Sequence, residues 1–456
     1  MKQLREEDKI LLSVKKIHMI GIGGSGMCPL AEILFNKGYT VTGSDNNESD
    51  PLKRVMVKGI KVFMGHNAQN INGAELVVYS AAIKDDNAEL AAAKEQGIPT
   101  MERSFLLGAL TRMYENVIGV CGTHGKTSVT SMITQVLVLC GKDPTAVIGG
   151  KLPLIGSNSV TGQSDLMVCE ACEFVDTFLK LSPDISVLLN IDNDHLDYFK
   201  TMENLTNSFK KFIGMSSVAV VNGDDDLVKA ATNGISAQII TFGFGENNMY
   251  KAKNEYSSKR GWHFDIFKGE EKLGEIELSI PGKHNVYNAL AAFSVCHYLG
   301  VESGEIIDAL QKFGGAGRRF EFIGEFGNGF TLADDYAHHP TEITATLSAA
   351  KQLPFKKVVC VFQPFTFSRT ALLLNEFIEA LKLADEVVLT EIMGSREKNV
   401  YGVTSQDIAN KLNNVKIINE FSEIADYLLK TKGKDDLVIT MGGGDIYKVC
   451  HIIEEK

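Results

Sequence analysis

The chain has 456 residues and a mass of 49.9 kDa, which is enough for about two to four domains with separate hydrophobic cores. Its formal net charge of −11 and isoelectric point near 5.5 argue against a nucleic-acid-binding protein, which would need a basic surface. The N-terminal segment is charged, and no apolar run approaches the roughly 18 residues needed to cross a bilayer, so we predict a cytoplasmic protein without membrane insertion.

The first elements in chain order alternate short β-branched strands with helix-like stretches, a pattern typical of parallel sheets with crossover helices. A predicted strand over 15–20 leads into a glycine turn, Gly21–Gly26, that fits G-x-G-x-x-G, and Asp45 ends the next predicted strand. Such a turn brings a diphosphate close to a helix N-terminus. It suits a nicotinamide-dependent dehydrogenase and equally any other protein that binds a nucleotide diphosphate.

A second glycine loop follows a predicted strand over 116–122 and opens a predicted helix. Its sequence, GTHGKT, is a variant of the G-x-x-x-x-G-K-[ST] phosphate loop, because Val120 stands where the strict pattern has glycine. The glycines let backbone amides face an anion, Lys126 supplies a positive charge, and Thr127 would place its hydroxyl on Mg²⁺. We therefore predict a nucleotide-phosphate site in this loop.

Acidic residues end two apolar strands in the same block. The strand LMVCE ends at Glu170, and the exit of VLLNIDNDH carries Asp192 and His195. Carboxylates at the carboxyl edge of a parallel sheet are the metal ligands that a phosphate-transfer site needs. The CxxC pair, Cys169 and Cys172, has no second pair at zinc-ligand spacing, so we interpret both as buried reduced thiols.

An antiparallel-looking stretch over 261–280 precedes a predicted helix in GKHNVYNALAA. We interpret Asn285 as the cap of this helix, with Asn288 one turn further on the same face. Together with His284, these side chains are candidates for contacts to the edge of a base.

The third block opens at a glycine-rich hinge, FGGAG, over 313–317. The segment DDYAHHP then places two acids and two histidines before a proline that starts a predicted helix, and this density of titratable groups marks a candidate site. Arg318, Arg319 and Arg369 are suited to bind phosphate or carboxylate.

The order of strands and helices predicts an α/β fold with three domains. The simplest division of the chain is 1–112, 113–316 and 317–456. The glycine-rich hinge lies at the second boundary.

The chain resembles the ATP-dependent Mur ligases of peptidoglycan synthesis along essentially its whole length. Nine segments carry the resemblance in order: GIGGSGM, GTHGKT, EACE, NIDNDHLDYF, GKHNVYNALAA, GRRFE, DDYAHHPTE, QPFTFSRT and MGGGDIY. It implies a Rossmann-like UDP-binding domain, a P-loop-type ATPase domain and a Rossmann-like amino-acid-binding domain. The branch that the chain resembles joins L-alanine to the lactyl carboxylate of UDP-N-acetylmuramate, with ATP and Mg²⁺.

The resemblance also implies which residues act. The UDP-sugar is expected on Gly23, Gly24, Ser25, Gly26 and Asp45, and the amino acid on Tyr336 and Arg369. ATP is expected on Gly122, Thr123, His124, Gly125, Lys126, Thr127, Ser128, His284, Asn285, Asn288, Arg318 and Arg319. The expected Mg²⁺ ligands are Thr127, Glu170 and His195, and the expected catalytic groups are Lys126, His195, Asp335, His338, His339 and Arg369.

The chain departs from the family pattern in two segments. The family's Q-P-H-x-Y-[ST]-R-T reads QPFTFSRT here, so Phe365 replaces the usual histidine and Phe367 the usual tyrosine, while Arg369 is kept. In EACE, Cys172 stands where an aspartate is often found. The first departure leaves the affinity for the amino acid and the identity of the acceptor open.

We predict an amide ligase that activates a carboxylate as an acyl phosphate and then lets an amine displace phosphate. A histidine of the His338–His339 pair or Asp335 is the candidate base. The alternatives are a muropeptide-recycling ligase that adds a tripeptide, an NAD-dependent dehydrogenase and a regulatory P-loop switch. The sequence does not distinguish a monomer from a homodimer, nor L-alanine from glycine or L-serine.

Overall fold

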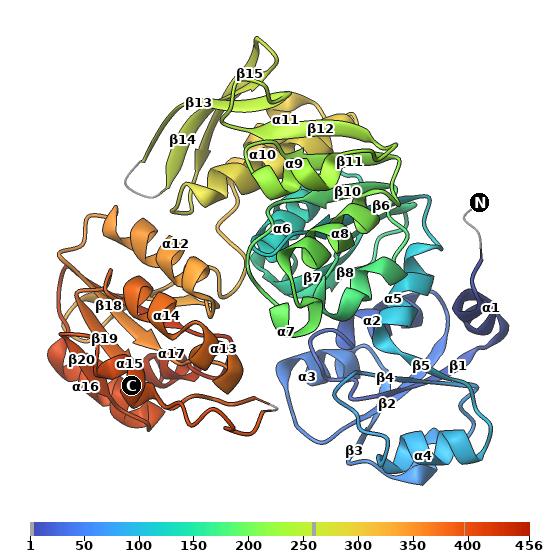
Figure 1. Cartoon of the computed structure of the whole chain (residues 1–456). Coiled ribbons are helices and arrows are strands. Elements are labelled where there is room, and N and C mark those ends of the chain that lie inside the picture. The colour runs from blue at the N-terminus through green and yellow to red at the C-terminus, as the bar shows by residue number, and fades with distance from the viewer. Residues whose placement is uncertain (1–3, 258–260, 396) are drawn as a thin grey trace. The chain divides into compact units, whose positions relative to one another are not determined.

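The computed structural model describes residues 4–257, 261–395 and 397–456. Its strands form three sheets, and the chain groups into two compact units. The first unit holds the first sheet and most of the second, and the second unit holds the third sheet with segments 252–266 and 272–287. Helices flank the strands of each sheet (Figure 1). The predicted fold class is confirmed, whereas the exact domain boundaries stay predictions.

The first sheet is parallel and has the order β3-β2-β1-β4-β5. Its strands are β1 (Lys16–Ile20), β2 (Thr40–Asp45), β3 (Lys61–Met64), β4 (Leu76–Tyr79) and β5 (Thr100–Glu102). The accompanying helices are α1 (Glu6–Ser13), α2 (Cys28–Asn36), α3 (Asp50–Val57), η1 (Ala68–Ile71), α4 (Ala88–Glu95) and α5 (Arg103–Thr111). The strand order reverses between β1 and β4, which is where ligands bind in sheets of this type. The loop after β1, Gly21–Gly26, lies at this point.

The central sheet has the order β15-β14-β13-β12-β11-β10-β6-β9-β7-β8. Its strands are β6 (Asn116–Cys121), β7 (Thr145–Leu152), β8 (Ser157–Val160), β9 (Leu166–Glu170), β10 (Ile185–Leu188), β11 (Val218–Asn222), β12 (Gln238–Gly243), β13 (Tyr250–Ser257), β14 (Trp262–Lys268) and β15 (Glu271–Leu278). The strand β6 lies between β9 and β10 and is parallel to both. The loops at the carboxyl ends of these three strands therefore meet at one edge.

The helices of the central block include two that pack directly on this sheet. They are α6, against β6, β7 and β9, and α8, against β10 (Figure 1). In chain order the helices are α6 (Lys126–Leu139), η2 (Pro153–Ile155), η3 (Phe174–Lys180), α7 (Leu196–Phe199), α8 (Met202–Ile213), α9 (Asp226–Thr232), α10 (His284–Tyr298) and α11 (Ser303–Gln311). The helix α6 is buried along most of its length, with threonine and serine side chains inside as well as apolar ones.

The third sheet has the order β16-β17-β21-β18-β19-β20, with only β16 antiparallel to its neighbour. Its strands are β16 (Glu321–Phe326), β17 (Phe330–Asp335), β18 (Lys357–Phe362), β19 (Glu386–Leu389), β20 (Val415–Ile417) and β21 (Asp436–Met441). Its helices are α12 (Pro340–Lys351), α13 (Phe367–Leu372), α14 (Leu374–Leu381), α15 (Ser405–Ala409), α16 (Phe421–Thr431) and α17 (Lys448–Glu454).

Both faces of the third sheet are covered. Alternate residues of β18 enter separate cores, because successive side chains of a strand point to opposite faces. Cys360 and Phe362 pack with α12 and α14, whereas Val359 and Val361 pack with α16 and α17. This arrangement explains why the strand reads as a continuous apolar run.

Two predictions about local structure are wrong. Asn285 is the second residue of α10 and not its cap, because the helix starts at His284, soon after Gly282 with its φ of +97°, two residues earlier than a cap at Asn285 implies. The Asn285 side chain instead donates to the Pro281 carbonyl oxygen at 2.7 Å. Cys169 is buried, as predicted, but Cys172 is exposed because it follows the strand in a loop.

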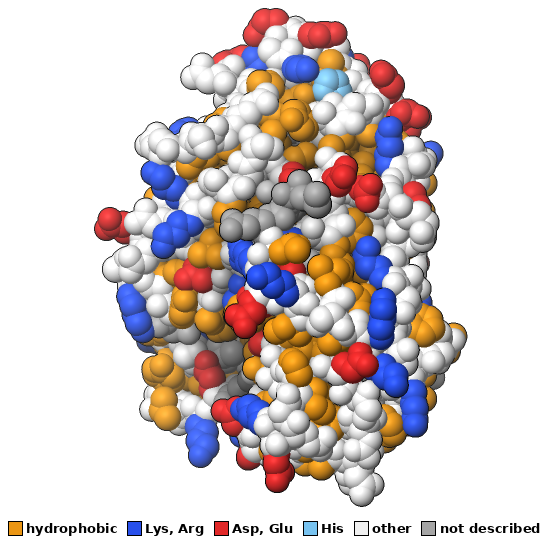
Figure 2. Space-filling model, turned by 90° about the vertical axis from the view of Figure 1, so that its right-hand side faces the viewer, with side chains coloured by type: hydrophobic (Ala, Val, Ile, Leu, Met, Phe, Trp, Pro, Cys, Tyr) orange, Lys and Arg blue, Asp and Glu red, His pale blue; other side chains and the backbone are white. Residues whose placement is uncertain are grey.

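Basic and acidic side chains both occur on the face drawn in Figure 2. Nucleic-acid binders usually concentrate basic groups on one face. Among the described residues, no helix has both the length and the apolarity of a membrane span.

Candidate active site

The GTHGKT loop joins β6 to α6 and contains two glycines with positive φ. Gly122 has a φ of +136° and Gly125, which caps α6, a φ of +85°. A side chain at Gly125 would place its Cβ 2.7 Å from the Oδ1 atom of Asn288. Only glycine therefore fits the end of the loop, and Asn288 lies against it.

Lys126, the first residue of α6, is folded onto its own loop and onto one acid. Its Nζ atom donates to the carbonyl oxygens of Gly122 at 2.6 Å and Thr123 at 3.0 Å. The Glu173 carboxylate lies 3.1 Å away through Oε1 and 3.0 Å through Oε2. Burial alone would lower the pKa of Lys126, but the charge and hydrogen bond of Glu173, together with the nearby Cys172 and Glu170, outweigh it and raise that pKa above its ordinary value. The lysine is thus a fixed positive charge at the helix N-terminus.

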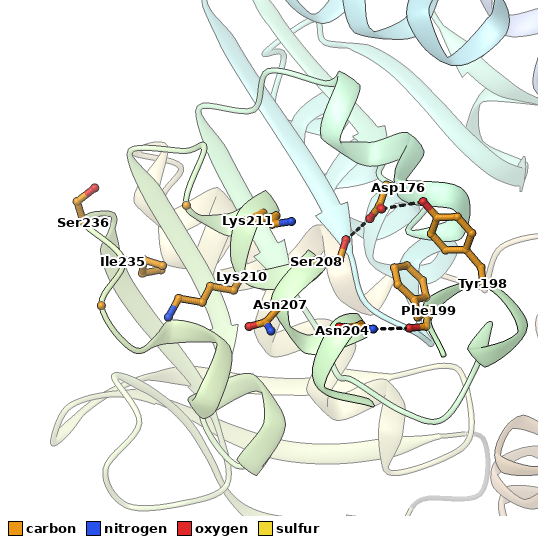
Figure 3. A pocket seen from close by; sticks show the side chains of 12 residues that line it. Asp176, Tyr198, Phe199, Asn204, Asn207, Ser208, Lys210, Lys211, Ile235 and Ser236 are labelled. Carbon is orange, nitrogen blue, oxygen red and sulfur yellow. Dashed lines mark hydrogen bonds between the residues drawn. The ribbon is translucent and has the colours of Figure 1, made fainter. Parts of the chain in front are cut away.

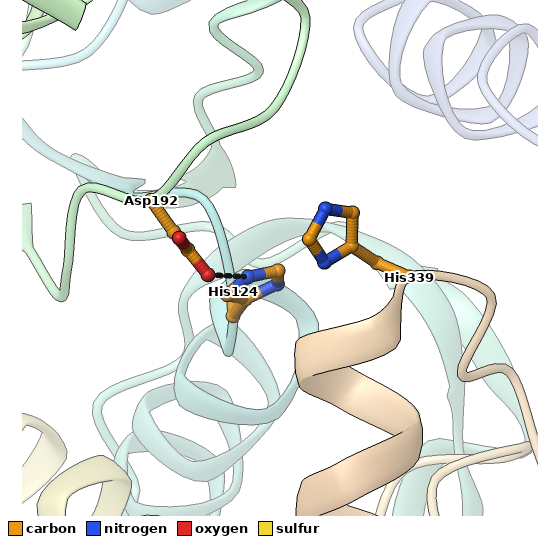
Figure 4. Close-up of side chains that lie close together, drawn as sticks. All are labelled: His124, Asp192 and His339. Carbon is orange, nitrogen blue, oxygen red and sulfur yellow. Dashed lines mark hydrogen bonds and ion pairs between the residues drawn. The ribbon is translucent and has the colours of Figure 1, made fainter. Parts of the chain in front are cut away.

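The segment after β10 is hydrogen-bonded to the lysine loop. Thr123 N donates to the Asn190 carbonyl oxygen at 3.1 Å, and His124 N donates to Asn190 Oδ1 at 2.8 Å. The His124 ring contacts Asp192, with Nε2 3.1 Å from Oδ2 (Figure 4). These contacts fix the chain that leads to His195 relative to the phosphate loop.

The expected metal ligands lie at the ends of neighbouring elements. Thr127 is buried in the first turn of α6, and Glu170 ends β9, where its Oε1 accepts a hydrogen bond from Gly149 N at 2.6 Å. His195 starts α7 with a φ of +56°, and its Nε2 lies 3.6 Å from the Asp194 carboxylate. No distance among these three groups establishes a shared site, so the ligand set stays a prediction.

Glu173 is a further acid that the sequence analysis missed. Its side chain is buried, and its Oε2 atom receives no hydrogen bond among the described residues although Lys126 Nζ is 3.0 Å away. A buried carboxylate oxygen with a free lone pair suits a hard divalent cation. The residues present therefore fit Mg²⁺. The EACE segment did contain the signal, since Glu173 is its second acid.

The glycine loop of the first sheet contains the predicted diphosphate site. Gly21 has a φ of +75°, and Gly23 N donates to Asp45 Oδ2 at 2.9 Å, so Asp45 fastens the loop. The carbonyl oxygen of Ser25 accepts from Asn158 Nδ2 at 2.9 Å. Gly24 N donates back into the same turn, to the Gly21 carbonyl oxygen at 3.1 Å.

Arg103 is a second residue that the sequence analysis missed. A Cβ atom at Gly26 would lie 3.0 Å from the Nη1 atom of Arg103, so the guanidinium borders the loop. Arg103 follows directly after β5, at the carboxyl edge of the parallel sheet. That position could have been recognised from the sequence, because ligands bind at this edge.

Asp335 and the two histidines of DDYAHHP have different environments. Asp335 is buried and accepts from Phe320 N and Ala337 N, each at 2.7 Å, and burial raises its pKa to about 6. His339 caps α12, and its Nδ1 accepts from Thr341 N at 3.3 Å (Figure 4). The side chains of Asp335 and His339 therefore fix the backbone of this segment through hydrogen bonds.

His338 is placed differently from His339 and Asp335. Its Nδ1 lies 3.0 Å from the carbonyl oxygen of Tyr336, which can only accept, so Nδ1 carries the hydrogen and Nε2 is the basic nitrogen. Burial lowers the pKa of His338; the Glu342 carboxylate opposes this effect and the Arg369 charge adds to it. His338 is therefore a neutral base that faces a carboxylate and a guanidinium.

The substituted segment packs on the same histidine. The Phe365 ring meets the His338 ring at a centroid distance of 5.6 Å and an angle of 75°. Phe367 lies against Gly394, whose φ is +73°. Phe365 thus closes one side of the space around His338 with an apolar surface.

The arginines of this block differ in how much of their hydrogen-bonding capacity is used. Arg318 donates to Asp334 at 2.7 Å and to the carbonyl oxygens of Gly442 at 2.8 Å and Gly444 at 3.2 Å. Arg319 lies 3.8 Å from the Glu342 carboxylate and 5.2 Å from the centre of the Tyr336 ring. Arg318 therefore braces the fold, and Arg319 is better placed for a ligand.

Comparison with known proteins gives matches along almost the whole chain. Three family models match in order: "Mur ligase family, catalytic domain" at 16–115, "Mur ligase middle domain" at 120–296 and "Mur ligase, glutamate ligase domain" at 318–444. A UDP-N-acetylmuramate–L-alanine ligase of Caldicellulosiruptor bescii is 48% identical over 451 residues, which is 97% of this chain and 99% of that protein.

Two solved structures extend the comparison. A UDP-N-acetylmuramate–alanine ligase from Thermotoga maritima matches with a TM-score of 0.83 and 29% identity, covering 96% of this chain and 98% of its own. A murein peptide ligase from Psychrobacter arcticus matches with a TM-score of 0.73 and 23% identity, covering 97% and 99%. The second likeness concerns the fold alone.

Proposed function

Because the chain belongs to the Mur ligase family, we propose that it joins L-alanine to the lactyl carboxylate of UDP-N-acetylmuramate, with hydrolysis of ATP, in peptidoglycan precursor synthesis. The observation that carries the proposal is Lys126, ion-paired with Glu173 at the N-terminus of α6, in a loop where only glycine fits beside it. A helix N-terminus with a fixed cation suits the phosphates of ATP. The identity of 48% to an L-alanine ligase, over 97% of this chain, supports L-alanine as the acceptor.

In the first step, a carboxylate oxygen of UDP-N-acetylmuramate attacks the γ-phosphorus of ATP. The P–O bond to ADP breaks, and an acyl phosphate forms. Lys126 and the backbone amides of the loop offset the negative charge that develops on the phosphoryl group. Mg²⁺, when bound, supplies further positive charge at the phosphates, and Thr127, Glu173, Glu170 and His195 are the residues that would hold it.

In the second step, the amine of L-alanine attacks the acyl carbon, and the C–O bond to phosphate breaks. The amine must lose a proton, and we assign its removal to His338, because Nε2 is its basic nitrogen and burial keeps the ring neutral. Arg369 would bind the alanine carboxylate, since its charge lies close enough to lower the pKa of His338. Asp335 and His339 instead fix the backbone of this segment by accepting hydrogen bonds from backbone N–H groups.

The UDP diphosphate belongs, in this proposal, to the loop Gly23–Gly26, with Arg103 as its cation. A dehydrogenase is not favoured, because it would leave Lys126 and Glu173 without a role. A regulatory P-loop switch would leave His338 and Arg369 without one. A recycling ligase shares the fold, but two solved peptide ligases that match are 23% and 27% identical to the chain, whereas the L-alanine ligase of Caldicellulosiruptor bescii is 48% identical. The cytoplasmic location and a homodimer stay predictions.

The test is phosphate release from ATP and Mg²⁺ with UDP-N-acetylmuramate, alone and with L-alanine, glycine, L-serine or a tripeptide. We expect release that needs both the sugar nucleotide and L-alanine and that falls at least about 100-fold in Lys126→Ala. Lys229→Ala is the matched control, because Lys229 is an exposed lysine whose ion pair with Asp226 lies within α9. Release with the tripeptide alone, or without any acceptor, would contradict the proposal.

A further inference from the structure

The turn after β9 has an unusual backbone conformation. Val175 and Asp176 both have a φ of +53°, with ψ values of 35° and 25°, inside the segment Phe174–Lys180. This left-handed region is unfavourable for a residue with a side chain, and it disfavours a β-branched valine most. Such strain persists only where the surroundings fix the chain.

The Asp176 carboxylate connects this turn to two helices. Its Oδ2 accepts from the Tyr198 hydroxyl of α7 at 2.9 Å, and its Oδ1 accepts from the Ser208 hydroxyl of α8 (Figure 3). Its backbone N–H donates to the Glu173 carbonyl oxygen at 2.9 Å. These groups lie at a pocket of about 840 Å³ whose wall includes Asp176, Tyr198 and Ser208. One side chain therefore joins three segments that are separate in the sequence.

Two of these segments carry groups of the nucleotide site. Glu173, three residues before Asp176, is the carboxylate that contacts Lys126. His195, three residues before Tyr198, starts α7 and accepts from Tyr198 N through its carbonyl oxygen at 3.0 Å. The two turns also touch directly, because the rings of Phe174 and His195 are 4.8 Å apart.

We propose that Asp176 is a positioning residue that fixes Glu173 and His195 relative to each other through its hydrogen bonds to Tyr198 and Ser208, and so maintains the divalent-cation site at the ATP phosphates. The inference rests on the proposed function, because it needs a nucleotide and a cation at Lys126. The chemistry of the contact fits: Asp176 raises the pKa of Tyr198, so the phenol stays protonated and donates. Groups that orient metal ligands in this way commonly change metal affinity about 10–100-fold when they are removed.

The test measures cation binding directly, on the full chain, by electron paramagnetic resonance with Mn²⁺ and a non-hydrolysable ATP analogue. We expect Asp176→Asn and Tyr198→Phe to weaken Mn²⁺ binding about 10-fold, because each disrupts the contact between the two turns. The affinity for the analogue without a cation should change less than twofold. Thr206→Val is the matched control, because the Thr206 hydroxyl donates only to Met202 within α8.

The outcomes separate this inference from the proposed function. Unchanged Mn²⁺ affinity in both variants, with a lower melting temperature, would make Asp176 a stabilising residue only and overturn the inference. Failure of the unmodified protein to bind Mn²⁺ with the analogue would overturn the proposed function as well. If Asp176→Asn does not fold, Tyr198→Phe decides, because it removes one exposed hydroxyl and keeps the ring.

Discussion

At the scale of single residues, the candidate site is built from groups whose environment sets their charge. Lys126 stays protonated because Glu173 lies beside it, and His338 stays neutral because it is buried. A carboxylate thus has different effects at the two groups. Glu173 keeps Lys126 positively charged, whereas Glu342 only partly opposes the lowering of the pKa of His338 by burial. The charge state assigned to each side chain can be tested by substituting one neighbouring residue.

The assignment of His338 as the base predicts the direction of a pH shift. Because its pKa lies below the ordinary value of 6.5, the acid limb of kcat at saturating L-alanine should lie below pH 6.5. The Glu342 carboxylate stabilises the protonated ring, so Glu342→Gln should lower that pKa and move the limb to lower pH by on the order of 1 unit. An unmoved limb in this variant, or a limb that persists in His338→Asn, would assign the base elsewhere.

The position of Arg103 predicts a selective loss of affinity. Arg103→Ala should raise KM for UDP-N-acetylmuramate about 10–100-fold, the usual worth of a charged hydrogen bond, while KM for ATP stays unchanged. Arg103→Lys keeps the positive charge but loses the several N–H donors of the guanidinium. Its KM for UDP-N-acetylmuramate should lie between those of the unmodified protein and Arg103→Ala. Steady-state kinetics with each substrate varied in turn measures the effect. Equal changes in both KM values would indicate a general loss of structure.

At the scale of elements, the turn from β6 into α6 decides whether the phosphate loop can form. Gly125→Ala puts a Cβ atom 2.7 Å from Asn288 Oδ1 at a φ of +85°, so we expect ATP affinity to fall at least about 10-fold. Gly141→Ala is the matched control at the other end of α6, because Gly141 also has a positive φ, +66°, but nothing within 4 Å. Calorimetric titration with ATP distinguishes loss of the loop from a general effect of alanine, since only the first variant should weaken binding.

A buried cluster in the first sheet predicts how stability depends on pH. The Glu89 carboxylate is buried, yet its pKa is lowered to about 2, because hydrogen bonds from His18, Ser44 and Asn70 outweigh the cost of burial. The contribution of the ionised Glu89 carboxylate to the free energy of unfolding is therefore complete above pH 4.5 and is lost as the pH falls towards 2. We expect Glu89→Gln to lower the free energy of unfolding at pH 7 by on the order of 3 kcal/mol. Denaturant unfolding should show this deficit shrinking below pH 4.5, and a constant deficit would contradict it.

Elements were easier to predict from the sequence than contacts. The strand–glycine–helix pattern indicated both glycine loops, and apolar runs ending in acids indicated β9 correctly, since these signals are local. Glu173 and Arg103 were missed because their roles depend on which strands are neighbours. The fastening of the first loop by Asp45 also depends on the tertiary structure. The start of α10 was placed two residues late, because the positive φ of Gly282 is not readable from its neighbours.

At the scale of the whole molecule, the proposed reaction requires the ATP, UDP-sugar and L-alanine sites to cooperate. Each belongs to a different part of the chain, and an acyl phosphate that met water would hydrolyse before the amine reached it. We therefore expect the protein to become more compact when an ATP analogue and UDP-N-acetylmuramate bind together. Small-angle X-ray scattering should show a lower radius of gyration with both ligands than with either one.

A substitution in the hinge FGGAG tests whether this compaction is needed for turnover. Gly315 has a φ of +104°, so Gly315→Ala should restrict the hinge, lower kcat about 10-fold and abolish the ligand-induced compaction, while ATP affinity is kept. Gly402→Ala is the matched control, because Gly402 has a φ of +67° with nothing within 4 Å and lies outside the hinge. A normal kcat in Gly315→Ala would show that the hinge does not limit turnover. Ligand-induced compaction that persists in Gly315→Ala would show that closure does not depend on the freedom of this glycine.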